Sequence, residues 1–265
     1  MAKKKKHRVR NTLLNLAIIA CLAVIAVCGY KIGSFFWDIH KSKSVNEELI
    51  KSVPQPSSAP SASTDARWVP TQQTYDALHA ENSDYVGWIL WDSDLISEPI
   101  VQGKTNNSYL RTDFKGNYSV WGTVFVDADE TLPATNTMIY GHSYGGVKTD
   151  HTKFSQLQNM TDQTFCDQNA TFKIYWDGRI DSYKVFAVSV VDSSTDDWIY
   201  SKGEFTDGSD EQQWIDDAVN RSQISSDIVP SVTDKFVTLQ TCADQTSALR
   251  YIVSAVQTDE QPYKQ

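Results

Sequence analysis

The chain has only four cysteines and five histidines among its 265 residues, and none of them has the spacing of a zinc-binding set. It also lacks a glycine-rich loop of the kind that holds a phosphate group, and it has no internal repeat. We therefore expect no metal site and no cofactor. Any chemistry would have to come from the side chains themselves.

Basic residues are outnumbered, with 24 Lys and Arg against 33 Asp and Glu, which gives a formal net charge of −9. Residues 1–10 nevertheless carry six basic side chains and no acidic one, so the rest of the chain is more acidic than the total. Because phosphate contacts need Lys and Arg, this acidic body argues against a nucleic-acid partner.

The basic tip, residues 1–10, precedes an almost unbroken apolar run from Leu13 to Tyr30, in which Asn15 is the clearly polar interruption. Eighteen helical residues span about 27 Å, close to the thickness of a bilayer core. We predict a transmembrane anchor over 11–32 with a cytoplasmic N-terminus and an extracellular body. A cleaved signal peptide is the alternative.

A Pro/Ser/Ala tract over 54–64 reads as an extended linker that cannot bury a core. We therefore predict a stalk and linker over 33–67 and one folded domain over 68–265. About 200 residues are enough for a single hydrophobic core.

Short segments rich in Val, Ile, Tyr and Phe predict a mainly β domain. The pattern favours a mostly antiparallel, closed or nearly closed sheet with peripheral helices. Strands are expected near 84–91, 95–101, 120–126, 137–141, 171–176, 182–191, 235–241 and 250–257, and helices at 71–82, 152–160 and 210–222.

Cys21 and Cys28 fall inside the apolar run, whereas Cys166 and Cys242 belong to the predicted domain. An exported protein could join the latter two in a disulfide. We expect two free thiols instead, because Cys242 stands where a nucleophile would be useful.

Cys242 ends the strand that starts at Lys235, and Arg250 begins the next one. If the two strands pair as a hairpin, Cys242 lies roughly opposite Arg250. A free thiol has a pKa of about 8.5, and a nearby guanidinium would raise the thiolate fraction and could stabilise an oxyanion. A buried structural cysteine and a surface arginine are the alternative.

His142 is the candidate acid and base, because Gly141 before it and the glycines at 145–146 after it predict a strand that turns sharply into a loop. A structural histidine is the alternative, and His151 is the second choice. Asp244 could orient His142 or Arg250 or bind substrate, or it could be a solvated loop residue.

Together these residues resemble the sortases, the cysteine transpeptidases of Gram-positive cell surfaces. Thr238 to Cys242 is similar to the family's TLxTC signature, Tyr140-Gly141-His142 to its histidine segment, and Arg250 to its arginine. Segments 84–89, 98–102 and 121–127 resemble blocks of class B members, and a helix just before the cysteine strand also suits that class.

The resemblance implies a closed eight-stranded β-barrel with added helices and a three-residue site. Cys242 would attack a Thr carbonyl to form a thioacyl enzyme, His142 would move protons, and Arg250 would hold the oxyanion. The substrate groove would be lined by Asn106, Leu110, Ser194, Trp198 and Ile199, with Asp244 as a further substrate contact.

The implied substrates are surface proteins with an NPxTN- or PxTG-like C-terminal sorting signal. The implied acceptor is an amine of peptidoglycan or of its lipid-linked precursor. Gln240 and the pair Trp198-Ile199 depart from the usual class B residues, so the sorting signal stays open. Two other functions stay open as well: a thiol hydrolase that releases the product to water, and a non-catalytic, membrane-anchored β-domain that binds a surface partner.

Overall fold

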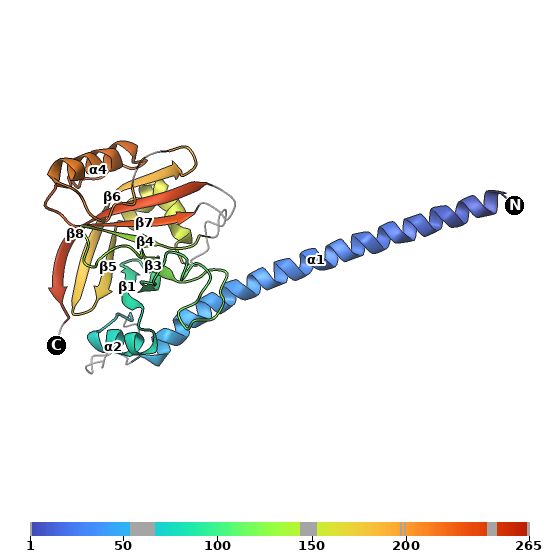
Figure 1. The fold of residues 1–265 in the computed structure, drawn as a ribbon, viewed down its shortest axis with the longest axis horizontal. Helices are drawn as coiled ribbons and strands as arrows, with labels where there is room; N and C mark the ends of the chain where they lie inside the picture. Colours follow the sequence, from blue (N-terminus) through green and yellow to red (C-terminus); the bar gives the residue numbers. More distant parts are fainter. Residues whose placement is uncertain are drawn as a thin grey trace. The chain divides into compact units, whose positions relative to one another are not determined.

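The structure is a computed structural model that describes residues 2–53, 67–143, 153–196, 198, 200–242 and 248–263, with the backbone alone for residues 2–12, 39, 42, 43 and 242. The chain divides into two compact units, Met1–Lys41 and Ser42–Gln265. Helix α1 (Ala2–Ser52) supplies the first unit and also enters the second (Figure 1).

Within the first unit, the stretch Leu13–Asp38 is long and apolar enough to cross a membrane, judged by length and composition. Its large apolar side chains, such as Leu22 and Ile25, are exposed. The anchor predicted over 11–32 therefore overlaps this candidate membrane span, which extends further, to Asp38.

In the described part of the second unit, eight strands close into a barrel in the order β1-β2-β3-β4-β7-β8-β6-β5. This confirms the expected closed barrel. Most neighbours are antiparallel, but β2 pairs with β3, and β4 with β7, in parallel. The strands are β1 (Tyr85–Trp91), β2 (Ser97–Val101), β3 (Val124–Val126), β4 (Asn136–Tyr140), β5 (Thr171–Trp176), β6 (Arg179–Asp192), β7 (Phe236–Cys242) and β8 (Leu249–Pro262).

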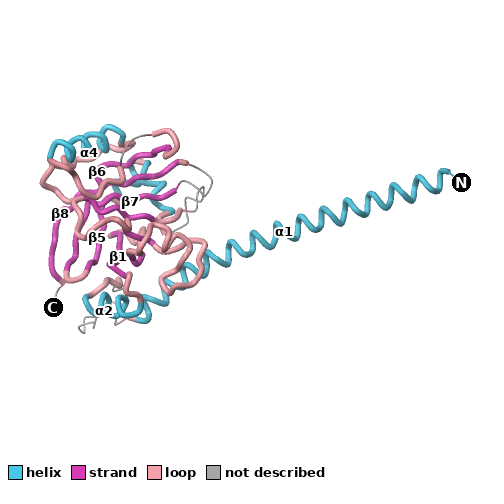
Figure 2. Tube along the Cα trace, in the orientation of Figure 1, coloured by secondary structure: helices cyan, strands magenta, loops and turns pink. Residues whose placement is uncertain are grey.

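Helices cover the outside of the barrel (Figures 1 and 2). Helix α2 (Gln72–Glu81) packs on β1 and begins with a capping box in which Thr71 and Thr74 bond each other's backbone N–H. Helix α4 (Gly208–Arg221) packs on β6, and its Asp207 cap accepts from two backbone N–H groups. A short 3-10 helix η1 (Ser155–Thr161) and helix α3 (Gln163–Gln168) lie between β4 and β5 in the sequence.

Side chains of β7 point alternately into the barrel and outward to α4, so this strand packs on both. Val237 and Leu239 belong to the cluster that fills the barrel, whereas Phe236 packs with Trp214 and Ala218 of α4 on the outside. A strand buried on both faces is firmly placed in register, and β7 is the strand that carries the predicted nucleophile.

The end of α1 differs from the predicted stalk, because residues 42–53 pack on the domain. Leu49 is fully buried and Val53 is 5% exposed, both in a cluster with Trp88 of β1. Glu48 also forms an ion pair with Lys115 at 2.7 Å. Apolar residues at 45, 49 and 53 recur every four positions, which gives this polar helix one apolar stripe. The linker tract at 54–64 lies outside the described residues.

Candidate functional site

Three neighbouring strands carry the three predicted catalytic residues to one end of the barrel. In the parallel β4–β7 pair, Tyr140 lies beside Gln240, and the N–H of Gly141 donates to the Gln240 carbonyl at 3.1 Å. In the antiparallel β7–β8 pair, Cys242 lies directly opposite Arg250, as the hairpin argument predicted. Residues 142, 242 and 250 therefore sit at the ends of adjacent strands.

The imidazole of His142 is held by the backbone of the loop after β2. Its Nε2 lies 2.8 Å from the carbonyl oxygen of Leu110. Because a carbonyl can only accept, Nε2 carries a proton, and Nδ1 is the acceptor nitrogen of the neutral ring. This contact orients the ring without consuming its basic nitrogen.

Burial lowers the pKa of His142, and the charges of Arg111 and Lys153 lower it further, while the hydrogen bond to Leu110 opposes them. The neutral imidazole is therefore favoured over the imidazolium in these surroundings. A neutral ring can take a proton from a thiol or an incoming amine.

Arg250 is half-buried, and its Nη1 donates to the Leu249 carbonyl at 3.0 Å. Its charge also reaches Asp192 at the end of β6, whose pKa is lowered mainly by hydrogen bonds from Ser194 and additionally by Arg250. Ser194 binds Asp192 Oδ1 through both its backbone N–H and its hydroxyl, at 3.0 and 2.6 Å. Ser194 thus lies in the turn after β6, beside the start of β8, and is exposed to solvent. The side chain of Cys242 is outside the described part of the chain.

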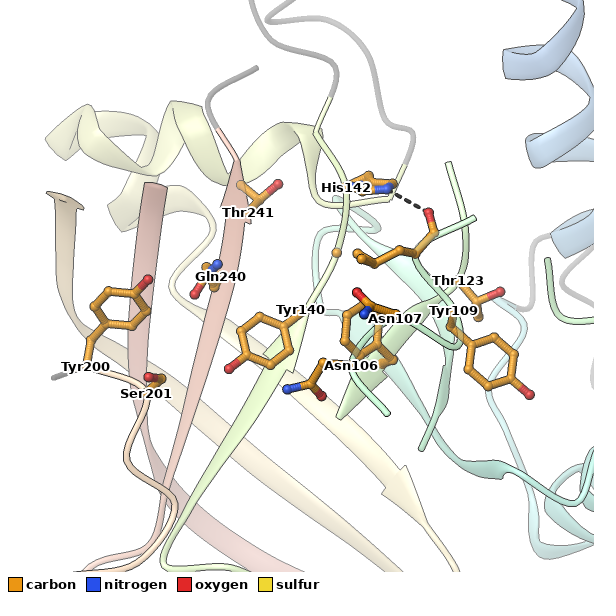
Figure 3. A pocket seen from close by; sticks show the side chains of 13 residues that line it. Asn106, Asn107, Tyr109, Thr123, Tyr140, His142, Tyr200, Ser201, Gln240 and Thr241 are labelled. Carbon is orange, nitrogen blue, oxygen red and sulfur yellow. Dashed lines mark hydrogen bonds between the residues drawn. The ribbon is translucent and has the colours of Figure 1, made fainter. Parts of the chain in front are cut away.

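A cavity of about 340 Å³ opens next to His142, and Asn106 and Leu110 line it as expected of groove residues. In Figure 3, Tyr200 and Ser201 lie on one side of Gln240, and Tyr140 and Asn106 lie on the other. The other lining residues are Asn107, Tyr109, Thr123, Phe125, Gly141 and Thr241.

A polar network fixes one wall of this cavity. The Tyr140 hydroxyl donates to Asp127 Oδ2 at 2.8 Å, and the Asn106 amide donates to the same oxygen at 3.1 Å. The Asn106 carbonyl in turn accepts from the Ala128 N–H at 2.7 Å. Burial and the neighbouring carboxylate raise the pKa of Tyr140, so its hydroxyl stays a donor.

Sequence reasoning missed several lining residues, above all Tyr140, Tyr200, Ser201 and Gln240. Tyr140 and Gln240 each stand two positions before a predicted catalytic residue, His142 or Cys242, and this spacing could have identified them. Tyr200 and Ser201 directly follow the predicted groove residues Trp198 and Ile199, so the resemblance pointed to their segment but not to these two side chains.

Trp198 does not line the cavity beside His142; it lines a second cavity of about 320 Å³ beside α4. It is 8% exposed, and the guanidinium of Arg221 lies 5.2 Å from its ring centre. Ile199, Asp244 and His151 fall outside the described residues. The substrate roles of Ser194, Trp198, Ile199 and Asp244 stay predictions.

Cys166 is a free thiol that is 2% exposed in the barrel core, and burial raises its pKa to about 11. A thiol that is protonated and enclosed in this way is a poor nucleophile. Among the side chains that the structure describes, no three His, Cys, Asp or Glu residues gather as a metal site.

Comparison with known proteins identifies the class to which this barrel and its strand-end residues belong. A family model described as the sortase domain matches residues 93–258, so the chain belongs to the sortase family. Sortases are cell-surface enzymes with transpeptidase-type activity.

The relatives place the chain in class B. It is 30% identical over 233 residues to Sortase B of Staphylococcus aureus, covering 87% of this chain and 90% of that one. It is 26% identical to Sortase B of Listeria monocytogenes, with 89% and 92% covered. A Staphylococcus aureus sortase B–substrate complex superposes with a TM-score of 0.65 at 30% identity, covering 71% of this chain and 86% of that one.

Proposed function

We propose that this sortase is a cysteine transpeptidase whose catalytic residues are Cys242, His142 and Arg250. It would cleave an NPxTN- or PxTG-like C-terminal sorting signal after Thr and transfer the protein to a cell-wall amine. The observation that carries the proposal is the pairing of β7 with both β4 and β8: Cys242 lies opposite Arg250, and Tyr140, two residues before His142, lies beside Gln240, next to a cavity that His142 lines.

In the first half-reaction, the Cys242 thiolate attacks the carbonyl carbon of the signal's Thr. Arg250 stabilises the negative charge that develops on the carbonyl oxygen. Directly opposed residues of an antiparallel pair have Cβ atoms about 5 Å apart on one face of the sheet, which supports this partnership. The peptide C–N bond then breaks to leave a thioester.

His142 moves the protons of both halves. As imidazolium it gives a proton to the departing amine, and as neutral imidazole it takes one from the incoming amine. The second amine forms a new amide with the Thr carbonyl carbon, and the C–S bond breaks to restore the thiolate. The lowered pKa of His142 suits the base step at neutral pH and makes the imidazolium the minor form.

The cavity beside His142 is the proposed place for the sorting signal. Leu110 and Phe125 offer apolar surface, while Asn106, Ser201 and Gln240 offer hydrogen-bonding groups. A relative that is 30% identical was solved with a substrate bound, which supports a peptide site on this fold. We assign the candidate span Leu13–Asp38 as a single-pass anchor with the domain outside the cell.

The test uses the full chain in lipid nanodiscs with a library of NPxTN- and PxTG-like peptides. We expect Cys242→Ala to abolish cleavage and the thioacyl adduct seen by mass spectrometry, while Cys166→Ala, the matched control, keeps both. Unchanged turnover in Cys242→Ala would refute the proposal. Adding oligoglycine or a diaminopimelate-type peptide separates amide exchange from simple hydrolysis, and an unreactive Cys242 would instead favour a non-catalytic binding domain.

A further inference from the structure

A buried ion pair lies behind the histidine segment. The Lys153 Nζ is 2.7 Å from Glu98 Oε2, and the backbone N–H of Lys153 donates to Glu98 Oε1 at 3.2 Å. Glu98 belongs to β2 and is 5% exposed, and Lys153 is 3% exposed. One carboxylate therefore holds both the charge and the backbone of the same lysine.

The backbone of Lys153 has a φ of 50°, in the left-handed region that residues other than glycine seldom adopt. Such a conformation persists where the surroundings impose it. The two hydrogen bonds to Glu98 supply that restraint, because they fix the direction of the N–H and of the side chain together.

Phe154, the residue after Lys153, links the restrained backbone to His142. Its N–H donates to the His142 carbonyl at 2.9 Å, and its ring is fully buried in the barrel core. The ring also packs against the backbone of Gly141, where an added Cβ would lie 2.6 Å from the Phe154 Cγ. The placement of Gly141 and His142 thus depends on Phe154, and Phe154 follows Lys153 directly.

We propose that Glu98 and Lys153 are positioning residues for His142, with the ion pair fixing the backbone that holds the histidine toward the reacting atoms. This inference rests on the proposed function of His142. Neither Glu98 nor Lys153 lines the cavity. Both therefore act on His142 indirectly, through the packing of Phe154 and through their charges.

The charges of Lys153 and Glu98 predict the direction in which the pKa of His142 should shift in each variant. Among the described side chains, the charges of Arg111 and Lys153 act on the His142 imidazole. Removing the Lys153 ammonium should raise the pKa of His142. Removing the Glu98 carboxylate leaves the ammonium uncompensated and should lower it. A merely loosened fold would not move the pKa in opposite directions.

The experiment compares Lys153→Met and Glu98→Gln in the full chain in nanodiscs, with ¹³Cε1-labelled histidine for NMR titration and a library peptide that the wild type cleaves for kinetics. We expect opposite shifts in the His142 pKa. We also expect kcat to fall at least about tenfold with KM within about twofold, because misplacing a catalytic group affects the chemical step.

The matched control is Asp181→Asn, which removes the buried carboxylate that pairs with Arg179 at the start of β6. It should lower the melting temperature while leaving kcat and the His142 pKa unchanged. If a single variant fails to fold, the double variant Glu98→Gln/Lys153→Met leaves no unpaired buried charge and should still lose kcat about tenfold.

Unchanged kcat and unchanged His142 pKa in the Glu98 and Lys153 variants, with His142→Ala inactive, would overturn this inference and leave the proposed function standing. Full activity in His142→Ala would overturn the proposed function instead. In that case the sign of the two pKa shifts still decides whether the ion pair acts on His142.

Discussion

Cys242 and Arg250 face each other across the last described pair of the β7–β8 ladder. The relationship is a property of the backbone register of the two strands, which holds from Phe236↔Val256 to Cys242↔Arg250. This register is the basis of the role proposed for Arg250 at position 242.

This geometry predicts a strong effect of Arg250→Lys. Lysine keeps the charge but loses the planar fork of donors, so we expect kcat/KM for the peptide to fall about a hundredfold. Arg179→Lys is the control and should cleave like the wild type, because Arg179 lies at the far end of the β6–β8 ladder from Arg250. Equal activity of the Arg250 and Arg179 variants would exclude a role for Arg250 in oxyanion binding.

Tyr140→Phe should weaken the cavity wall. It removes the 2.8 Å hydrogen bond to Asp127, a bond to a charged acceptor whose loss costs about 2 kcal/mol of stability. Tyr263→Phe removes a bond to a neutral carbonyl of Trp176 and should cost about 1 kcal/mol. Urea unfolding of the Ser42–Gln265 unit measures both, and a Tyr140 variant as stable as the wild type would contradict the network.

The raised pKa of Glu130 predicts how the stability of the domain depends on pH. Burial, aided by Asp127 and Glu204, raises its pKa from 4.5 to about 8, although the Met138 N–H opposes the shift. The folded state thus holds this proton more tightly than the unfolded state, so stability declines as pH rises from about 4.5 to 8.

Since Glu130 is half-buried, we discount the effect to roughly 2 kcal/mol. Urea midpoints at pH 5 and pH 9 should differ in the wild type and converge in Glu130→Gln, which cannot titrate. The same decline in the Gln variant would assign the pH dependence to another group.

The end of α1 should stabilise the domain. Leu49 is fully buried, so Leu49→Ala should cost about 3 kcal/mol, whereas the exposed Lys51→Ala should change stability by less than about 0.5 kcal/mol. A fragment that starts at residue 68 should lose stability in the same way against one that starts at residue 42. Denaturant unfolding of these four proteins checks both statements, and a neutral Leu49→Ala would mean that the helix end is not docked in solution.

Local pattern was enough to predict much of this protein. The helix at 72–81, the strand segments and the apolar run each follow from periodicity, capping residues and composition within a short window. The hairpin argument for Cys242 and Arg250 also worked, because a short connection leaves few possible registers. The stripe at 45, 49 and 53 was readable too, but its burial depends on Trp88 and Phe114, which are distant in the chain.

The sequence by itself determined which segments become strands and which residues could carry acyl-transfer chemistry. Only the tertiary structure decided that β4 lies parallel to β7, which places Tyr140 beside Gln240, two residues before positions 142 and 242. It alone revealed the Glu98–Lys153 pair and the packing of Phe154 on Gly141. The physical reason is that strand pairing and core packing depend on the closure of the whole barrel, and no short window of sequence contains that information.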